Sequence, residues 1–435
     1  MASFGTPHNR ASELALEIYA NVLEEVRADR LVQRAVERAG DYLFVHGNHI
    51  DLSSFDRVWI AGAGKASVTM AHALGDILGP KLAGGLVITK SGYGFPLPGI
   101  EVIESSHPIP DETSLLAGER MIQFGESLTE KDLVIFTLSG GASALMESLV
   151  PSVSLEDLRA TTQALMANSS SISQLNYVRS KLSRIKGGKL SQVFFPATVI
   201  VLVLSDVIGN DLRIVGSGPF FTPSRTVLRS RFTSPIVFPQ GLFSKPVSDL
   251  RENQSLNLWS AFPDVQHYVV GSISVAIHAA TDAARAVGLG PLPYADPMLG
   301  EARTMAGKIC RHASQRNLYH QCMIFGGETT VTLHGNGIGG RSQEMAVAAA
   351  SAISKLPNTC FLAAGTDGSD GPTDAAGGIV DPDSMNRARS AGFRVPKTLK
   401  ENDSYHFLEA CDGLIKTGPT GSNVNDLVLV VQAEN

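Results

Sequence analysis

The chain has 435 residues, of which 43% are hydrophobic and 18% are charged. These proportions exclude an intrinsically disordered protein, and the length predicts two domains, or three. The formal net charge of −6 argues against a nucleic-acid-binding protein, which normally presents a basic surface.

The cysteines and the apolar segments indicate the cellular environment. Four cysteines are scattered along the chain, without a CxxC pair or the spacing of a metal site. The first segment, MASFGTPHNR, lacks the apolar core of a secretory signal. The longest strongly apolar run, Ala197 to Leu204, is far shorter than the roughly 20 residues that a membrane span needs. We therefore expect a soluble cytoplasmic protein with reduced thiols and with no membrane or nucleic-acid partner.

In chain order, the first half of the sequence alternates helices with short apolar strands. Hydrophobic residues recur every four positions from Leu14 to Val26, which predicts an amphipathic helix. Ser154, with Asp157 three residues later, resembles a capping box and predicts a helix through Met166. Strands are predicted at residues 58–60, 85–89, 132–137 and 198–204, the last uniformly apolar, as in a parallel sheet covered on both faces.

A second alternating region follows residues 223–263, a weakly periodic segment that contains proline and serine and is predicted to include the domain boundary. Helices are predicted at 276–287 and from 343 to about 351, and strands at 267–271, 323–325 and 360–364. Strands that alternate with helices of this length indicate βαβ units, so the predicted class is α/β.

The first predicted strand runs into a glycine loop, GAGKAS, at residues 62–67. Backbone N–H groups at the start of a helix can bind a phosphate there, and Lys65 would add a positive charge. The loop is not a Walker A motif, because Ala66 replaces the Ser or Thr that holds magnesium. Nor is it a dinucleotide fingerprint, since Ser67 replaces the third glycine and the next strand ends in Lys90 instead of an acid. A tight turn with a solvated lysine is the alternative.

Two further strand ends carry candidate site residues. SGGAS at residues 139–143 has small residues and consecutive amides that can form an anion nest, although close packing also explains it. It is not a nucleophile elbow, because Leu145 stands where the second glycine is needed. Asp206 follows the apolar strand, at the end where open α/β sheets bind ligands. It is a candidate base or magnesium ligand, with a capping role as the alternative.

Charge is unevenly distributed. Five basic residues lie at 176–189, whereas no Asp or Glu occurs from Asn168 to Ser205. This patch fits a small anion such as a phosphate or a carboxylate, with a solvated helix face as the alternative. Arg341, after two glycines at a predicted helix start, is placed for bidentate contact with such an anion. Residues 365–374 hold three acids but no EF-hand, because Gly378 occupies the glutamate position; Asx turns explain them equally well.

The histidines carry no metal motif. None of the eleven forms an HExxH pair or another close cluster. His107 precedes Pro108 in the motif SSHPIPDE and is interpreted as structural. Nothing in the sequence favours a Ser–His–Asp hydrolase.

Laid end to end, these motifs resemble the class II glycerate kinase family, the glycerate 2-kinases, some of which are labelled hydroxypyruvate reductases. The resemblance spans nearly the whole chain, and the order of the motifs is specific although each alone is weak. The motifs are GAGKAS (62–67), SSHPIPDE (105–112), LSGGASAL (138–145), VRSKLSRIKGGKL (178–190), SDVIGND (205–211), GSGP (216–219), GGETTVTLHGNGIGGRSQE (326–344), GTDGSDGPTDAAGG (365–378) and TGPTGSNVND (417–426).

The resemblance implies a two-domain α/β protein. A larger Rossmann-like N-terminal domain with a parallel sheet would cover residues 1–245. A smaller α/β domain would cover 246–435, with a MOFRL-like core at about 320–430. The active site would lie in the cleft between the two domains. The oligomeric state stays open, with a homodimer as one candidate.

The resemblance also implies ATP- and Mg²⁺-dependent phosphorylation of the 2-hydroxyl of D-glycerate, giving 2-phosphoglycerate and ADP. Lys65, Asp206 and Arg341 match the family's proposed catalytic residues, and Arg179 or the neighbouring Lys181 would bind the glycerate carboxylate. The metal ligands are left unassigned. The residues implied for nucleotide binding are Gly62, Gly64, Ser139, Gly140, Gly141, Gly326, Gly327, Glu328 and Asp367.

The chain departs from the family pattern at Ala142, Ile208, Asn210 and Ser342. Asn210 replaces an acid, which would weaken a magnesium ligand, so no metal role is assigned to that position. Two alternative functions stay open: an NAD(P)H-dependent hydroxypyruvate reductase, disfavoured by the imperfect fingerprint, and a non-catalytic sensor of nucleotides or anions. A kinase acting on another small hydroxy acid is a further variant.

Overall fold

The computed structural model describes residues 5–167, 172–221, 265–316 and 318–434, which form two compact units. The central unit comprises Ala28–Val270, and the terminal unit joins Met1–Arg27 to Gly271–Asn435. The sequence predicts one N-terminal domain over residues 1–245, whereas the structure groups the first 27 residues with the C-terminal part. The predicted boundary segment, 223–263, falls almost wholly in the stretch 222–264, which lies outside the described residues.

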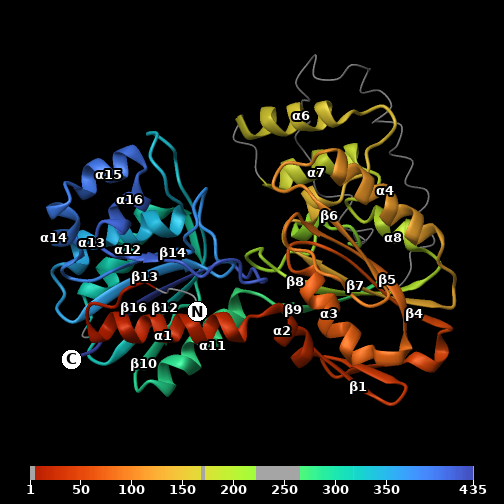
Figure 1. Cartoon of the computed structure of the whole chain (residues 1–435), viewed down its shortest axis with the longest axis horizontal. Helices are drawn as coiled ribbons and strands as arrows, with labels where there is room; N and C mark the ends of the chain where they lie inside the picture. Colours follow the sequence, from red (N-terminus) through yellow and green to blue (C-terminus); the bar gives the residue numbers. More distant parts are fainter. Residues whose placement is uncertain (1–4, 168–171, 222–264, 317, 435) are drawn as a thin grey trace. The chain divides into compact units, whose positions relative to one another are not determined.

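The central unit is built on a sheet (Figure 1) whose strands are β4 (Arg57–Ala63), β5 (Leu82–Lys90), β6 (Ile100–Ser105), β7 (Asp132–Ser139), β8 (Thr198–Leu204) and β9 (Val265–Gly271). Their order is β6-β5-β4-β7-β8-β9. Strands β4 to β8 pair in parallel, so their carboxyl ends meet at one edge of the sheet. The α/β class and the parallel sheet predicted from the sequence are confirmed.

Helices cover both faces of this sheet, namely α3 (Ser67–Leu78), α4 (Glu112–Glu126) and α8 (Lys189–Phe194). Phe136 of β7 faces the core shared with α4 and α8, where its ring lies 4.7 Å from that of Phe220. Thr137, the next residue, points to the opposite face. There the Ser67 hydroxyl donates to the Thr137 carbonyl (3.0 Å) at the start of α3. Burial from both sides explains why every residue of β7 is buried and why β8 is apolar after Thr198.

Smaller elements complete the central unit: α2 (Ala28–Ala35), β1 (Val36–Ala39), β2 (Tyr42–Val45), β3 (Asn48–Asp51), α5 (Ala142–Leu145), α6 (Leu155–Ala167), α7 (Ile172–Leu182) and a 3-10 turn at Val215–Ser217. The predicted capping box at α6 is confirmed, since the Asp157 N–H donates to the Ser154 hydroxyl (3.1 Å) and the Ser154 N–H to Asp157 (2.9 Å). The antiparallel sheet β1-β2-β3 is not predicted, because its strands of four residues are too short to show a period.

The terminal unit contains a mixed sheet, ordered β10-β12-β16-β13-β14-β15, with β11 beside β12. Its strands are β10 (Gly290–Pro293), β11 (Met298–Glu301), β12 (Gln321–Thr330), β13 (Thr359–Gly365), β14 (Gly377–Val380), β15 (Leu414–Ile415) and β16 (Asp426–Gln432). Its helices are α1 (Arg10–Glu25), α11 (Ile273–Ala286), α12 (Ala302–Ser314), α13 (Arg341–Ile353), α14 (Ser384–Ser390), α15 (Val395–Glu401) and α16 (Ser404–Glu409).

Helix α1 belongs to this unit because its apolar face packs on the sheet. Figure 1 shows α1 and α11 on one face of the sheet and α12 and α13 on the other. The buried Tyr19 of α1 donates its hydroxyl to the Gly365 carbonyl at the end of β13 (2.7 Å). After the helix, the Val26 carbonyl accepts the Ser422 hydroxyl. These long-range contacts account for the grouping of the N-terminal segment with residues several hundred positions away.

The cysteines are all buried and form no disulfide, as predicted. Burial raises the pKa of Cys310 and Cys322 to about 12, so both thiols stay protonated and unreactive. Among the helices of the described ranges, none has the length and apolarity needed to cross a bilayer.

Candidate active site

Two glycine loops interlock at the carboxyl edge of the central sheet. The first follows β4 and the second follows β7. The Lys65 N–H donates to the Gly140 carbonyl (3.0 Å), and the Ala66 N–H donates to the Ser139 hydroxyl (3.0 Å). The Gly64 N–H donates to the Ile88 carbonyl of β5 (3.1 Å). The two loops therefore form one rigid surface at the edge where open α/β sheets bind ligands.

Glycine is required in both loops because other groups approach the backbone closely. Gly64 has φ +138°, and a Cβ there would lie 2.1 Å from the Ser139 hydroxyl oxygen. A Cβ on Gly140 would lie 1.9 Å from a carboxylate oxygen of Asp206. The structure thus brings Asp206, which follows β8, directly over the loop that Lys65 contacts. Lys65 and Asp206, both predicted catalytic residues, share this edge.

His107 lies beside Lys65, although the sequence pattern favours a structural role for it. It follows β6, at the same edge of the sheet. Gly141 has φ +88°, and a Cβ there would lie 3.0 Å from the imidazole Cδ2 of His107 and 3.3 Å from Cγ of Lys65. The motif SSHPIPDE marks this segment, but its spacing alone does not place the ring against a loop 34 positions later.

The first loop has the features of an anion site and lacks those of a dinucleotide site. Helix α3 begins directly after it and directs its positive end to the loop, although the Ala66 N–H is bonded to the Ser139 hydroxyl (3.0 Å) and the Ser67 N–H to the Gly64 carbonyl (3.2 Å). Ser67 fills the place of the third glycine and is buried, while Thr89 at the end of β5 is bonded to the Lys65 carbonyl (3.4 Å). Strand β5 ends in Lys90, so no carboxylate stands where an NAD ribose would bind.

Gly62 lies inside β4, away from the loop. A Cβ at this position would lie 2.1 Å from the Thr137 hydroxyl oxygen of the neighbouring strand. Close packing of β4 against β7 accounts for this glycine.

The basic segment is connected to the second loop through a turn. The N–H groups of Gly187 and Gly188 donate to the carbonyls of Ser217 (3.0 Å) and Gly218 (2.7 Å). The Ser217 hydroxyl in turn lies 2.8 Å from that of Ser143, which follows the SGG sequence. Hydrogen bonds therefore link the end of the basic segment to the second loop.

Three of its basic residues, Arg184, Lys186 and Lys189, have structural partners inside the unit. Arg184 donates to the carboxylate of Glu119 (2.9 Å). Lys186 is buried and donates to the buried carboxylate of Glu147. Burial lowers the pKa of Lys186, and Glu147 opposes this. Lys189 donates to the Ser180 carbonyl (2.7 Å) near the C-terminus of α7, where a cation is favourable, and burial lowers its pKa to about 8.

Arg179 and Lys181, the predicted substrate-binding residues, lie on α7. Arg179 donates to the Thr162 hydroxyl (3.5 Å), and Lys181 lies over the ring of Tyr177. Burial lowers the pKa of both side chains. The buried acid Glu147 opposes the fall in the pKa of Arg179.

A second set of predicted residues lies in the terminal unit, around Arg341. Arg341 is the first residue of α13 and donates to both carboxylate oxygens of Asp426 (2.6 and 3.1 Å) and to Glu328 (2.6 Å). Burial opposes the charge of Arg341, but the two carboxylates outweigh burial and raise its pKa. Asp426, in the motif TGSNVND, is not predicted as a site residue. It lies 85 positions from Arg341, so only the pairing of β12 with β16 brings them together.

Asp370 completes this cluster and is also not predicted. Its carboxylate accepts the backbone N–H groups of Ser342 (3.1 Å) and Gln343 (2.8 Å) at the start of α13. Burial raises the pKa of Asp370 to about 7, with a further contribution from Asp426; the two N–H donors and Arg341 oppose the rise. A carboxyl group that titrates near neutrality next to a candidate catalytic arginine is a functional signal.

Of the remaining residues predicted to bind the nucleotide, two are glycines required for close packing and two are acids with polar partners. Gly326 and Gly327 lie inside β12, where a Cβ would lie 2.4 Å from Ile273 and from the backbone of Met298. Glu328 pairs with Arg341, as described above. Asp367 accepts the Ser369 N–H (3.0 Å) in an Asx turn, as its sequence context suggests.

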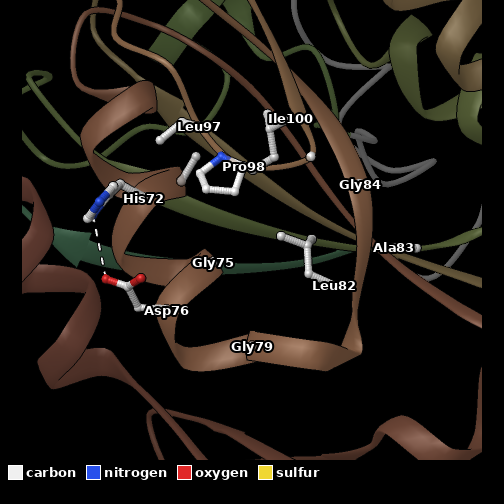
Figure 2. A pocket seen from close by; sticks show the side chains of 12 residues that line it. His72, Gly75, Asp76, Gly79, Leu82, Ala83, Gly84, Leu97, Pro98 and Ile100 are labelled. Carbon is white, nitrogen blue, oxygen red and sulfur yellow. Dashed lines mark ion pairs between the residues drawn. The ribbon is translucent and has the colours of Figure 1, made fainter.

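A cavity of about 360 Å³ lies elsewhere in the central unit (Figure 2). Figure 2 shows its lining of apolar and glycine residues with His72 and Asp76, whose side chains lie 3.6 Å apart. Leu82 and Ile100, which also line it, begin β5 and β6. The cavity therefore lies at the amino ends of the strands, away from the loops at their carboxyl ends, and is not the candidate active site.

Comparison with known proteins identifies the family. Residues 14–231 match the model of a "domain of unknown function (DUF4147)", and residues 321–426 match the MOFRL family. D-glycerate 2-kinase of Thermotoga maritima is 35% identical, over 96% of this chain and 97% of its own. A putative hydroxypyruvate reductase of Agrobacterium vitis is 37% identical, over 85% of this chain and 98% of its own. The crystal structure of a T. maritima glycerate kinase superposes with a TM-score of 0.81 at 34% identity, covering 97% of this chain and 99% of that one. The chain therefore belongs to the glycerate kinase family whose members combine a DUF4147 domain with a MOFRL domain.

Proposed function

We propose that the protein transfers the γ-phosphoryl group of ATP to the 2-hydroxyl of D-glycerate, giving 2-phosphoglycerate and ADP. The observation that carries the proposal is the close approach of Lys65, Asp206 and two glycine loops at the carboxyl edge of a parallel sheet. The substrate and the position of phosphorylation follow from the similarity to D-glycerate 2-kinase, which extends over 96% of the chain. We place the protein in the cytoplasm, because all four thiols are buried and unbridged.

The lysine and the loops act on the nucleotide. Phosphoryl transfer depends on positioning and on neutralising the charge of the transferred group. The positive N-terminal end of α3 and the ammonium group of Lys65 attract the phosphate oxygens. In the terminal unit Arg341, held by Asp426 and Glu328, is the candidate cation for a phosphate.

Asp206 acts on the acceptor. Its carboxylate lies against Gly140, next to the loop that carries Lys65, so a hydroxyl bound there can donate its proton to it. General-base assistance of this kind contributes about 10²–10⁴-fold. Arg179 and Lys181 provide the positive charge for the glycerate carboxylate.

Magnesium fits this site as an ion that arrives with the nucleotide. Within the described ranges, no group of three acids, histidines or cysteines could hold a metal by itself. Mg²⁺ bound to ATP needs only one or two protein carboxylates, because it keeps waters and phosphate oxygens as ligands. Asp206 is the carboxylate of the central unit that would hold the ion, as the alternative to its role as general base. When bound, the ion neutralises charge on the phosphates.

A reductase is the second candidate only because a relative carries that name. In this chain the buried Ser67 replaces the third fingerprint glycine, and Lys90 ends the strand where an acid would bind the ribose. Both features disfavour a nicotinamide cofactor and support the kinase.

One assay tests both the reaction and the position of phosphorylation. The full chain is incubated with Mg²⁺-ATP and D-glycerate, and the product is detected through enolase without phosphoglycerate mutase. A signal is expected, because enolase accepts 2-phosphoglycerate directly. A signal that requires mutase would show a 3-kinase, and no signal with mutase would refute the kinase. Oxidation of NADPH by hydroxypyruvate would then support the reductase.

A further inference from the structure

Asp370 joins the loop after β13 to the first turn of α13. It is 4% exposed, and each carboxylate oxygen accepts one backbone N–H, from Ser342 (3.1 Å) and from Gln343 (2.8 Å). The Gln343 side-chain amide returns a hydrogen bond to the Asp370 carbonyl (3.0 Å). Three hydrogen bonds therefore hold the loop and the start of the helix together.

Glycines let the two segments approach to backbone contact. A Cβ on Gly340 would lie 2.3 Å from the carboxyl carbon of Asp370. A Cβ on Gly371, which has φ +63°, would lie 2.2 Å from the Gly339 carbonyl oxygen. Because Arg341 directly follows Gly340, the backbone from which its side chain extends is positioned by Asp370.

The charges around Asp370 come from four elements and from its own loop. Arg341 of α13 and Asp426 of β16 act on it directly. The charge of Asp370 also raises the pKa of Tyr19 in α1. Glu328 of β12 raises the pKa of both Arg341 and Asp426, and Asp367 of the same loop raises that of Asp426. Burial outweighs the N–H donors and Arg341, so the pKa of Asp370 is about 7. Protonation near neutral pH would remove the charge that strengthens the bonds to the helix start.

We propose that Asp370 is a positioning residue for Arg341: its ionised carboxylate holds the first turn of α13 so that the guanidinium group keeps its place on Asp426 and Glu328. Three of the five guanidinium N–H groups donate to these carboxylates within the described part of the chain. The others are then available for the transferred phosphoryl group. The proposal rests on the role of Arg341 in the proposed kinase reaction.

The test uses the full-length variant Asp370→Asn, which keeps the size of the side chain and loses its charge. We expect kcat to fall roughly tenfold or more, since small displacements of a catalytic group are costly, with KM for ATP and for glycerate within about threefold. The wild-type kcat should rise with pH through about pH 7, and this acidic limb should disappear in the variant. An unchanged acidic limb would overturn the proposal.

The matched control is Asp381→Asn in the same unit. Asp381 is also 4% exposed, accepts the N–H of Asp383 (2.8 Å) near the start of α14 and binds an arginine, Arg387 (2.6 Å). In the part of the chain that the structure describes, no hydrogen bond or ion pair joins Asp381 to Arg341, so its variant should keep the wild-type pH profile. If Asp370→Asn does not fold, Asp370→Ser serves instead, because serine is small and its hydroxyl does not titrate near pH 7.

A double-mutant cycle separates positioning from general structure. Arg341→Lys retains a charge but lacks the fork that binds Asp426, so Asp370→Asn should have less than about a twofold effect in that background. An equal loss in both backgrounds would overturn the proposal. Full activity of Arg341→Lys would remove Arg341 from the mechanism, and with it the role of Asp370. A wild-type protein without kinase activity would instead refute the proposed function.

Discussion

The close contact between Gly140 and Asp206 allows a test by a single added methyl group. A Cβ at position 140 would lie 1.9 Å from a carboxylate oxygen of Asp206, whereas ordinary contacts begin at 3.4 Å. Gly140→Ala therefore displaces the carboxylate by about 1.5 Å. The backbone at Gly140 is outside the positive-φ region, and the obstructing atoms belong to a side chain that can rotate, so we expect little change in stability.

The expected effect on catalysis is large. A misplacement of about 1 Å can cost roughly 100-fold in rate, or about 2.7 kcal/mol of transition-state stabilisation. We therefore expect kcat for glycerate phosphorylation to fall about 100-fold in Gly140→Ala, with a thermal midpoint within about 2 °C of the wild type. The assay is steady-state turnover with enolase coupling, together with a thermal unfolding scan.

Two comparisons make this prediction specific. Gly75→Ala is the matched control, since Gly75 lies in α3 and a Cβ there would meet only Leu82 at 3.8 Å. It should keep full activity and gain up to about 1 kcal/mol in stability. In an Asp206→Asn background, Gly140→Ala should have little further effect, because both changes act on one carboxylate. A Gly140→Ala enzyme with kcat within twofold of the wild type would refute the role of Asp206.

Three further predictions follow from the basic segment. Lys186→Met leaves the buried Glu147 charge without its partner, so the free energy of unfolding in urea should fall by about 3–5 kcal/mol; a loss below about 1 kcal/mol would show that water reaches the pair. Arg179→Ala should raise KM for glycerate about tenfold or more and leave KM for ATP within threefold; the reverse pattern would assign Arg179 to the nucleotide. The pKa of Lys189 is lowered to about 8, so above that pH the folded protein binds fewer protons than the unfolded one, and stability should rise from about pH 8 towards pH 10.5. Lys189→Gln should reduce this rise relative to wild type in pH-dependent unfolding, and an unchanged slope would contradict the assigned pKa.

The local elements of the fold are predictable because their signals are local. Strand β8, Thr198–Leu204, coincides with a uniformly apolar run, and the capping box of α6 is present at Ser154 and Asp157. Helix α1 follows from a repeat of hydrophobic residues every four positions. The repeat does not predict the unit to which α1 belongs. An amphipathic face shows that a helix packs against something, but not against which sheet.

In the candidate site, too, some residues can be predicted from local sequence signals and others are brought together only by the tertiary structure. Glycine loops after apolar strands are visible in the sequence, so Lys65 and Asp206 can be predicted as site residues, and the structure places both at one edge of the sheet. The partners of Arg341 cannot be predicted, since Asp426 is 85 positions away and reaches it only through the pairing of β12 with β16. The approach of His107 to Lys65 is equally hidden in the sequence. The two residues follow β6 and β4, and the parallel pairing of both strands with β5 brings their carboxyl ends to one edge of the sheet.

Short-range order in this protein is thus determined by the sequence alone: the period of the apolar residues, the glycine turns and the caps specify the helices and strands where they stand. Tertiary structure decides which charged groups meet. Asp370 shows the difference most clearly, since its sequence context, an Asx-turn segment, gives no sign of a pKa near 7. That value arises from burial beneath the start of α13 and from the charge of Asp426, both of which exist only once the sheet has formed.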